Sequence, residues 1–216
     1  MKKNHRHFSF SDQICITIDN ALRAVSNQPK VTDRVYPGLS EAENPLTDTE
    51  RKHAAALMRV NHAGEVAAQA LYHGQAWTSR SADLKAKMHT AAVEEGDHLH
   101  WCYTRLMELN SHTSYLSSFW YGGSFAIGFT AGLLGDRWSL GFLAETEQQV
   151  VKHLDHHLEA LPKADKKSQQ ILQQMQIDEA HHRDDAIASG AAELPQPVKM
   201  LMRFLSKVMV KTAYWI

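Results

Sequence analysis

A short carboxylate–histidine motif occurs twice in this chain, and the repetition limits the folds that the chain can adopt. The motif reads EGDH at 95–98 and EAHH at 179–182. Each copy follows a single upstream glutamate, with 30 residues from Glu65 to the first motif and 32 from Glu147 to the second. Four glutamates and two histidines in this order are the ligand set of a carboxylate-bridged di-iron site inside a four-helix bundle.

Helical geometry explains why this spacing suits a metal pair. Residues i and i+3 lie on the same face of a helix, so the glutamate and the histidine of each motif can reach one metal together. The two upstream glutamates, on two other helices, would complete the coordination. Oxygen and imidazole ligands without a thiolate favour iron or manganese over zinc. The predicted metal ligands are Glu65, Glu95, His98, Glu147, Glu179 and His182.

Hydrophobic spacing and capping signals predict an all-α fold, a ferritin-like four-helix bundle with two additional membrane-facing helices. Thr47 and Glu50 form a capping-box pattern, Pro162 ends a helix and Gly190 has the position of a C-terminal cap. We expect an N-terminal arm over 1–45, including a short helix near 14–18, and a ferritin-like di-iron domain over 46–216 that includes the C-terminal amphipathic helix. The expected helices of this domain cover about 47–77, 81–110, 139–161, 165–190 and 198–214.

Acidic residues also stand directly before each motif. Metal-bound histidines usually donate their other ring N–H to a carboxylate. In a bundle with twofold pseudo-symmetry, we expect Asp178 to accept from His98 and Glu94 to accept from His182. His153 is a further candidate for a residue beside the ligands, whereas His156 and His157 are expected at the surface.

Two ligand positions have competitors. His181 is adjacent to His182, but aligning EEGDH at 94–98 with DEAHH at 178–182 favours His182, because His181 then matches Asp97. Glu145 competes with Glu147, and the spacing to His153 favours Glu147.

Charge and hydropathy indicate which classes of partner, nucleic acid or membrane, this chain is suited to bind. The chain has 23 basic and 24 acidic residues, which gives no indication of nucleic-acid binding. The uncharged run at 115–135 is long enough to cross a bilayer and contains a GxxxG from Gly128 to Gly132. A single crossing would separate the two halves of the metal site, so we expect this segment to return to the side it left. The basic amphipathic segment at 198–214 is typical of a helix on a membrane surface, and a simple packing helix explains it equally well.

With these residues in place, the sequence resembles the demethoxyubiquinone hydroxylase family. MRVNHAGE at 58–65 is the most specific match, and the segments at 94–98, 133–136 and 178–182 also fit. The resemblance implies two iron ions that activate dioxygen and hydroxylate the open ring carbon of a polyprenyl benzoquinol in ubiquinone biosynthesis. It also implies a peripheral protein on the cytoplasmic face of the cell membrane, with NADH as an external reductant and with homo-oligomers or biosynthetic complexes as assemblies.

Other functions remain open at the level of sequence. A different di-iron oxidase acting on another apolar substrate would share the ligand set, although MRVNHAGE argues against it. A ferritin-like iron-binding protein would be expected to lack the uncharged segment and the basic C-terminal helix. A purely structural bundle would bury six ionisable side chains without a metal, which is energetically unfavourable.

Overall fold

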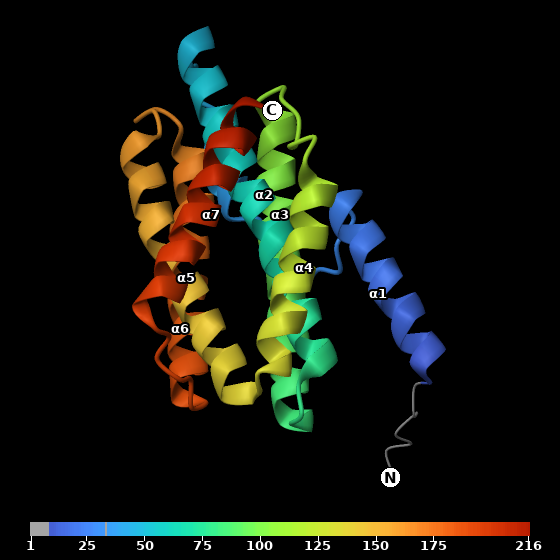
Figure 1. Cartoon of the computed structure of the whole chain (residues 1–216). Coiled ribbons are helices and arrows are strands. Elements are labelled where there is room, and N and C mark those ends of the chain that lie inside the picture. Colours follow the sequence, from blue (N-terminus) through green and yellow to red (C-terminus); the bar gives the residue numbers. More distant parts are fainter. Residues whose placement is uncertain (1–8, 33) are drawn as a thin grey trace.

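The computed structural model describes residues 9–32 and 34–216, and these residues form helices and loops without a strand. Residues 1–8 of the predicted arm lie outside this description. Figure 1 shows long helices running side by side, with α1 and α7 on the outside. The elements are α1 Phe10–Val25, the 3-10 turn η1 Pro37–Ser40, α2 Asp48–Thr78, α3 Ala82–Glu108, α4 Ser117–Leu133, α5 Asp136–Ala160, α6 Lys166–Ala188 and α7 Gln196–Trp215.

The predicted all-α organisation is confirmed, and the capping signals explain most helix ends. Thr47 and Glu50 form the expected capping box at the start of α2, which is worth about 1 kcal/mol. Gly190, two residues after the end of α6, adopts a φ of 97°, a conformation that favours glycine.

Three helices begin earlier than predicted. The first helix starts at Phe10 because Ser9 and Asp12 form a second capping box. α5 starts at Asp136, whose carboxylate accepts from the backbone N–H groups of Arg80 and Ser81 and suits a helix N-terminus. α7 starts at Gln196 because a proline in the first turn is compatible with a helix.

Helices α2, α3, α5 and α6 form the bundle that carries the metal-ligand candidates. α2 packs on α3 and α5 packs on α6, so the chain forms two helical hairpins that meet across the axis. A cluster of buried apolar side chains fills one end of the bundle and includes Met58, Leu154, Leu172 and Met175, all at most 1% exposed. The long connection between the hairpins is the uncharged segment, now helix α4.

α4 lies against α2 with almost no space between the two backbones. A Cβ atom added to Gly74 of α2 would lie 2.3 Å from the carbonyl oxygen of Phe125. A Cβ atom on Gly128 of α4 would lie 2.3 Å from the carbonyl oxygen of Leu71, and Gly132 is equally crowded by Thr78. The GxxxG of α4 is therefore a packing motif within this chain.

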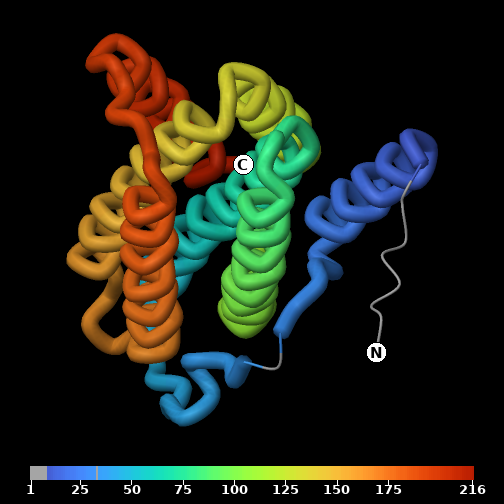
Figure 2. Tube along the Cα trace, turned by 90° about the horizontal axis from the view of Figure 1, so that it is seen from below, coloured from blue at the N-terminus to red at the C-terminus, as the bar shows by residue number. Residues whose placement is uncertain are grey.

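The described residues between α1 and α2 cross the outside of the bundle, and we call residues 30–32 and 34–46 the strap. In Figure 2 the blue parts of the strap lie at the lower edge of the bundle and lead to the start of α2. Glu43 in the strap accepts hydrogen bonds from the buried Arg105 of α3 at 2.8 and 3.0 Å. Asn44 bonds to the carbonyl of Ala164, just before α6. The strap therefore ties α3 to the start of α6.

Apolar side chains are exposed on the outer helices. On α7, Met200, Leu201 and Phe204 are 57–63% exposed, and on α4 Phe119 is 66% exposed. Within the described residues, no helix has both the length and the apolar character that a bilayer crossing requires.

Candidate metal centre

The six predicted ligands lie on the four bundle helices, all turned inward. Glu65 is on α2, Glu95 and His98 are on α3, Glu147 is on α5, and Glu179 and His182 are on α6. Each is buried, with exposures of 7% for His182 and at most 3% for the others. One ligand atom from each of Glu65, Glu95, His98 and Glu179 lies within 4.8 Å of the others, a spacing at which one metal ion can be held.

His98 faces three of the carboxylates. Its Nδ1 atom lies 3.0 Å from Glu179, 3.3 Å from Glu95 and 3.6 Å from Glu65. His182 provides the matching arrangement in the second half, with Nδ1 3.2 Å from both Glu95 and Glu179. Glu95 and Glu179 therefore face both histidines, whereas Glu65 lies on the His98 side.

Glu147 belongs to the His182 side. Its carboxylate interacts electrostatically with His182 and with the carboxylates of Glu179 and Glu95. The hydroxyl of Tyr72 donates to Oε1 of Glu147 at 2.9 Å. The two halves of the cluster thus share two central glutamates, and each half has one outer glutamate and one histidine.

The donor set fits a pair of cations. Each of the four glutamates has one carboxylate oxygen that is buried and accepts no hydrogen bond. Such unpaired charges are costly in a protein interior unless a cation compensates them. Divalent metals held by the four carboxylates and two imidazoles would supply that compensation.

Proton affinities in the cluster show the same excess of negative charge. Burial, supported by the charges of Glu179 and Glu95, holds the pKa of Glu147 well above its usual range. Burial opposes protonation of His182, but the hydrogen bond to Glu179 and the negative charges of Glu95 and Glu179 outweigh it and raise the pKa of His182 to about 12. Without metal the cluster therefore retains protons, which a metal cation would displace.

The crossed pairing expected from the sequence is present. Nε2 of His98 donates to Oδ2 of Asp178 at 2.9 Å, and Nε2 of His182 donates to Oε2 of Glu94 at 2.7 Å. These bonds fix each ring with Nδ1 toward the carboxylate cluster, the orientation that a metal ligand needs. Each histidine is thus oriented by an acid from the opposite hairpin.

The competitors of the predicted ligands lie outside the cluster. The side chain of His181 is 72% exposed and pairs with Asp185. Glu145 lies 3.6 Å from Nζ of Lys199 and accepts from Gln149. The structure therefore brings Glu147 and His182, not their neighbours, to the axis.

The predictions for the histidines at the end of α5 fare differently. His153 packs its ring 3.9 Å from that of His157, and no hydrogen bond among the described residues joins it to the cluster. The expectation that His157 lies at the surface is wrong. His157 is 6% exposed, and its Nδ1 bonds to Asn61 at 2.9 Å, so a polar partner on α2 makes its burial possible.

Comparison with known proteins identifies the family. The family model described as ubiquinone biosynthesis protein COQ7 matches residues 52–213. This chain belongs to the COQ7 family. A protein of Nitrosococcus oceani named 3-demethoxyubiquinol 3-hydroxylase is 54% identical over 98% of this chain and 99% of its own length. A protein of the same name from Nitrosospira multiformis is 55% identical over 95% of this chain and 98% of its own length. One from Acinetobacter baumannii is 49% identical over 98% of this chain and 100% of its own length.

The segment matched by the COQ7 family model contains all six cluster residues and both acids of the crossed pairs. The strap precedes this matched segment in the sequence, yet its residues contact the metal centre. Thr32 donates to Asp97 from its backbone N–H at 2.7 Å, and Arg34 donates to Asp178 at 2.5 Å. The carbonyl of Lys30 occupies the space where a side chain on Gly96 would lie.

Sequence reasoning missed two kinds of residue in this COQ7-family site. Tyr72 lies seven residues after Glu65, on the same face of α2, and this helical spacing is a signal that points it toward the axis. Thr32 and Arg34 had no comparable signal, because they lie in a loop and their partners are distant in the sequence. Asp97 follows Thr32 by 65 positions, and Asp178 follows Arg34 by 144 positions.

Proposed function

We propose that this protein hydroxylates the open ring carbon of a demethoxyubiquinol, as a di-iron monooxygenase of ubiquinone biosynthesis. The observation that carries the proposal is the buried cluster of four glutamates around two oriented histidines in a COQ7-family chain. The name shared by relatives that match nearly the whole chain supports the substrate and the reaction.

Iron is the metal that this donor set suits best, because oxygen and imidazole ligands without thiolates favour iron or manganese. Bound iron would supply the activation of dioxygen. In the balanced reaction, a ring C–H becomes C–OH with one oxygen atom, and the other leaves as water after taking up two electrons and two protons. An external reductant of the NADH class supplies these electrons. Glu95 and Glu179, which face both histidines, would help to hold both metals. Glu65 would contribute on the His98 side and Glu147 on the His182 side.

The bundle supports a ferritin-like assignment, because a single glutamate and a Glu-x-x-His pair alternate along its four helices. A ferritin-like iron store is the second candidate function. The exposed apolar faces of α4 and α7 favour the enzyme, since an iron store has no need of them.

A peripheral position on the cytoplasmic face of the cell membrane completes the proposal. α7 carries exposed Met200, Leu201 and Phe204 together with the exposed cations Arg203 and Lys207. A helix with this composition binds at the headgroup boundary of a membrane, where polyprenyl quinols are dissolved. Homo-oligomers or complexes with other biosynthetic proteins are compatible with this arrangement.

The deciding experiment measures iron content and quinol hydroxylation in the same preparation. We expect about two irons per chain, as the ligand set requires, and oxygen consumption that depends on a short-chain demethoxyubiquinol and yields the hydroxylated ring. The variants Glu95→Ala and Glu179→Ala should lose both properties. Iron uptake far beyond two per chain without quinol-dependent oxygen consumption would instead favour the iron store.

A further inference from the structure

The internal repeat allows the two halves of the bundle to be compared residue by residue. An offset of 82 residues relates α2 to α5, from Glu65 to Glu147. An offset of 84 residues relates α3 to α6, from Glu95 to Glu179. Every position around one histidine therefore has a counterpart around the other, and differences between counterparts show where the halves have diverged.

A cavity of about 350 Å³ adjoins the His182 half of the cluster. Its inner end is formed by Tyr72, which donates to Glu147, and by His182 itself. Apolar side chains of α3 and α5 line its sides, among them Met88, Leu140 and Leu143. Its outer end lies between α3 and α6, where Nζ of Lys87 bonds to Ser189 at 2.9 Å.

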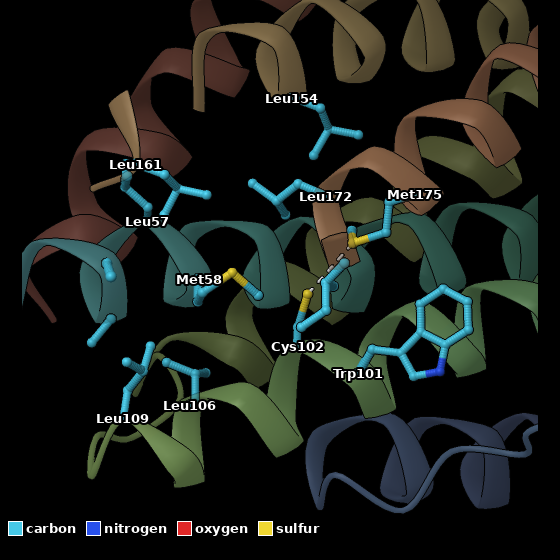
Figure 3. Close-up of a cluster of buried hydrophobic side chains, with 13 residues drawn as sticks. Leu57, Met58, Trp101, Cys102, Leu106, Leu109, Leu154, Leu161, Leu172 and Met175 are labelled. Carbon is cyan, nitrogen blue, oxygen red and sulfur yellow. Dashed lines mark hydrogen bonds between the residues drawn. The ribbon is translucent and has the colours of Figure 1, made fainter. Parts of the chain in front are cut away.

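The equivalent region of the His98 half is filled. The counterpart of Ala91, which lines the cavity, is Met175, and the counterpart of Tyr72 is Leu154. Met175 and Leu154 are 0% and 1% exposed and belong to the closely packed cluster in Figure 3. The filled half thus has a methionine where the open half has an alanine, and an apolar leucine where the open half has the hydroxyl-bearing Tyr72.

The strap adds a second barrier on the His98 side. Arg34 bonds to Asp178, the acid that orients His98, and stacks over the ring of Trp101 at 4.8 Å. A hollow of about 630 Å³ lies beneath the strap, but its lining includes none of the six cluster residues. On the His182 side, by contrast, a cluster residue itself lines the cavity.

We propose that the cavity beside His182 receives the aromatic ring of the substrate, so that hydroxylation takes place at the Glu147–His182 half of the centre. This inference rests on the proposed function and specifies where its substrate binds. The volume lies in the range of small-molecule sites and suits a substituted ring. The apolar walls formed by Met88, Leu140 and Leu143 match its methyl and prenyl substituents.

The repeat supplies the variant that tests this proposal. Ala91→Met introduces into the cavity the side chain that fills the other half. We expect at least a tenfold higher KM for a short-chain demethoxyubiquinol, with unchanged iron content and an unchanged or higher Tm. The corresponding quinone should also quench the tryptophan fluorescence of the metal-free protein, and this binding should be weakened to the same extent. Ala188→Met, at an exposed position of α6 outside the cavity, is the matched control.

The possible outcomes separate this inference from the proposed function. Wild-type KM and quinone binding in Ala91→Met would overturn the cavity assignment and leave the hydroxylase in place. An iron-loaded wild-type protein without hydroxylase activity, whose quinone binding is nevertheless weakened by Ala91→Met, would overturn the function and keep the cavity. If Ala91→Met loses iron or stability, Thr90→Trp at the exposed rim of the cavity provides the same test without entering the core.

Discussion

The guanidinium of Arg34 and the imidazole of His98 bond to the same oxygen atom, Oδ2 of Asp178, at 2.5 and 2.9 Å. A residue of the strap is therefore only one carboxylate away from a proposed metal ligand. The hydrogen bonds from His98 and Arg34 overcome the effect of burial and hold the pKa of Asp178 below its usual value. Asp178 is thus kept as an anion that orients His98.

Replacing Arg34 by alanine should loosen this arrangement. We expect a loss of about 1 kcal/mol in the free energy of unfolding, typical of a partly exposed ion pair. Iron should also pass to a chelator up to about tenfold faster, because Asp178 then orients His98 less firmly. Arg23→Ala removes an exposed ion pair with Asp19 on α1 and is the control. Equal rates of iron loss in the two variants would show that Arg34 does not support the centre.

The four glutamates should contribute unequally to metal binding. Glu95 and Glu179 each face both histidines, so Glu95→Ala and Glu179→Ala should lose both metals. Glu147→Ala should preferentially lose the metal on the His182 side. Metal analysis of the purified variants measures this order, with Glu145→Ala as a control that keeps both. Loss of the full metal content from Glu145→Ala would contradict the assignment.

Glycines in the α2–α4 contact should be intolerant of a side chain. Gly128→Ala should lower the free energy of unfolding by about 1–3 kcal/mol, because the new methyl group would overlap the carbonyl of Leu71. Gly122→Ala in the same helix meets no atom within 4 Å and should be stabilising by up to about 1 kcal/mol. Urea denaturation of the two variants gives the comparison, and similar free energies would show that the contact is loose.

Acid should destabilise the protein through His153. Burial, together with the charge of His156, lowers the pKa of His153 to about 4. Between pH 6.5 and 4 the unfolded chain binds a proton that the folded chain does not, so stability falls as the pH decreases. In His153→Leu, the decrease in the free energy of unfolding between pH 6.5 and pH 4 should be smaller by up to roughly 3 kcal/mol. Urea titrations of metal-free protein across this range provide the measurement, with exposed His181→Leu as the control.

Membrane binding should depend on the cations of α7. Neutralising Arg203, Lys207 and Lys211 to glutamine should weaken binding to anionic vesicles by about 100-fold, at about 1 kcal/mol for each charge. Lys199 is left unchanged because it lies near Glu145 and Glu193. Sedimentation with vesicles measures the effect, and neutralising the exposed Lys52, Lys152 and Lys163 is the matched control. Equal binding by both triple variants would exclude α7 as the anchor.

Residues with local or periodic signals were predictable from the sequence. The capping box at Thr47 predicted the start of α2, and the repeated motif predicted which residues meet at the axis. The crossed pairs were predictable because the pseudo-symmetry of the repeat limits which acid can reach each histidine.

Contacts that depend on packing between distant segments were not predictable. Nothing near Arg34 indicates that a loop will carry it to Asp178, and nothing near His157 indicates that Asn61 will pair with it in the interior. The cavity beside His182 also escaped prediction, because it depends on the volumes of side chains from four helices at once.

Each half of the metal centre is built from residues of both helical hairpins. His98 belongs to the first helical hairpin, but it is oriented by Asp178 and faces Glu179 of the second. Neither hairpin alone carries all the side chains that would hold one metal. Two fragments divided within α4 would each be poor metal binders, and only their reassociation would restore the site. A metal bound at this centre would join the two hairpins, and its binding free energy would also stabilise their association.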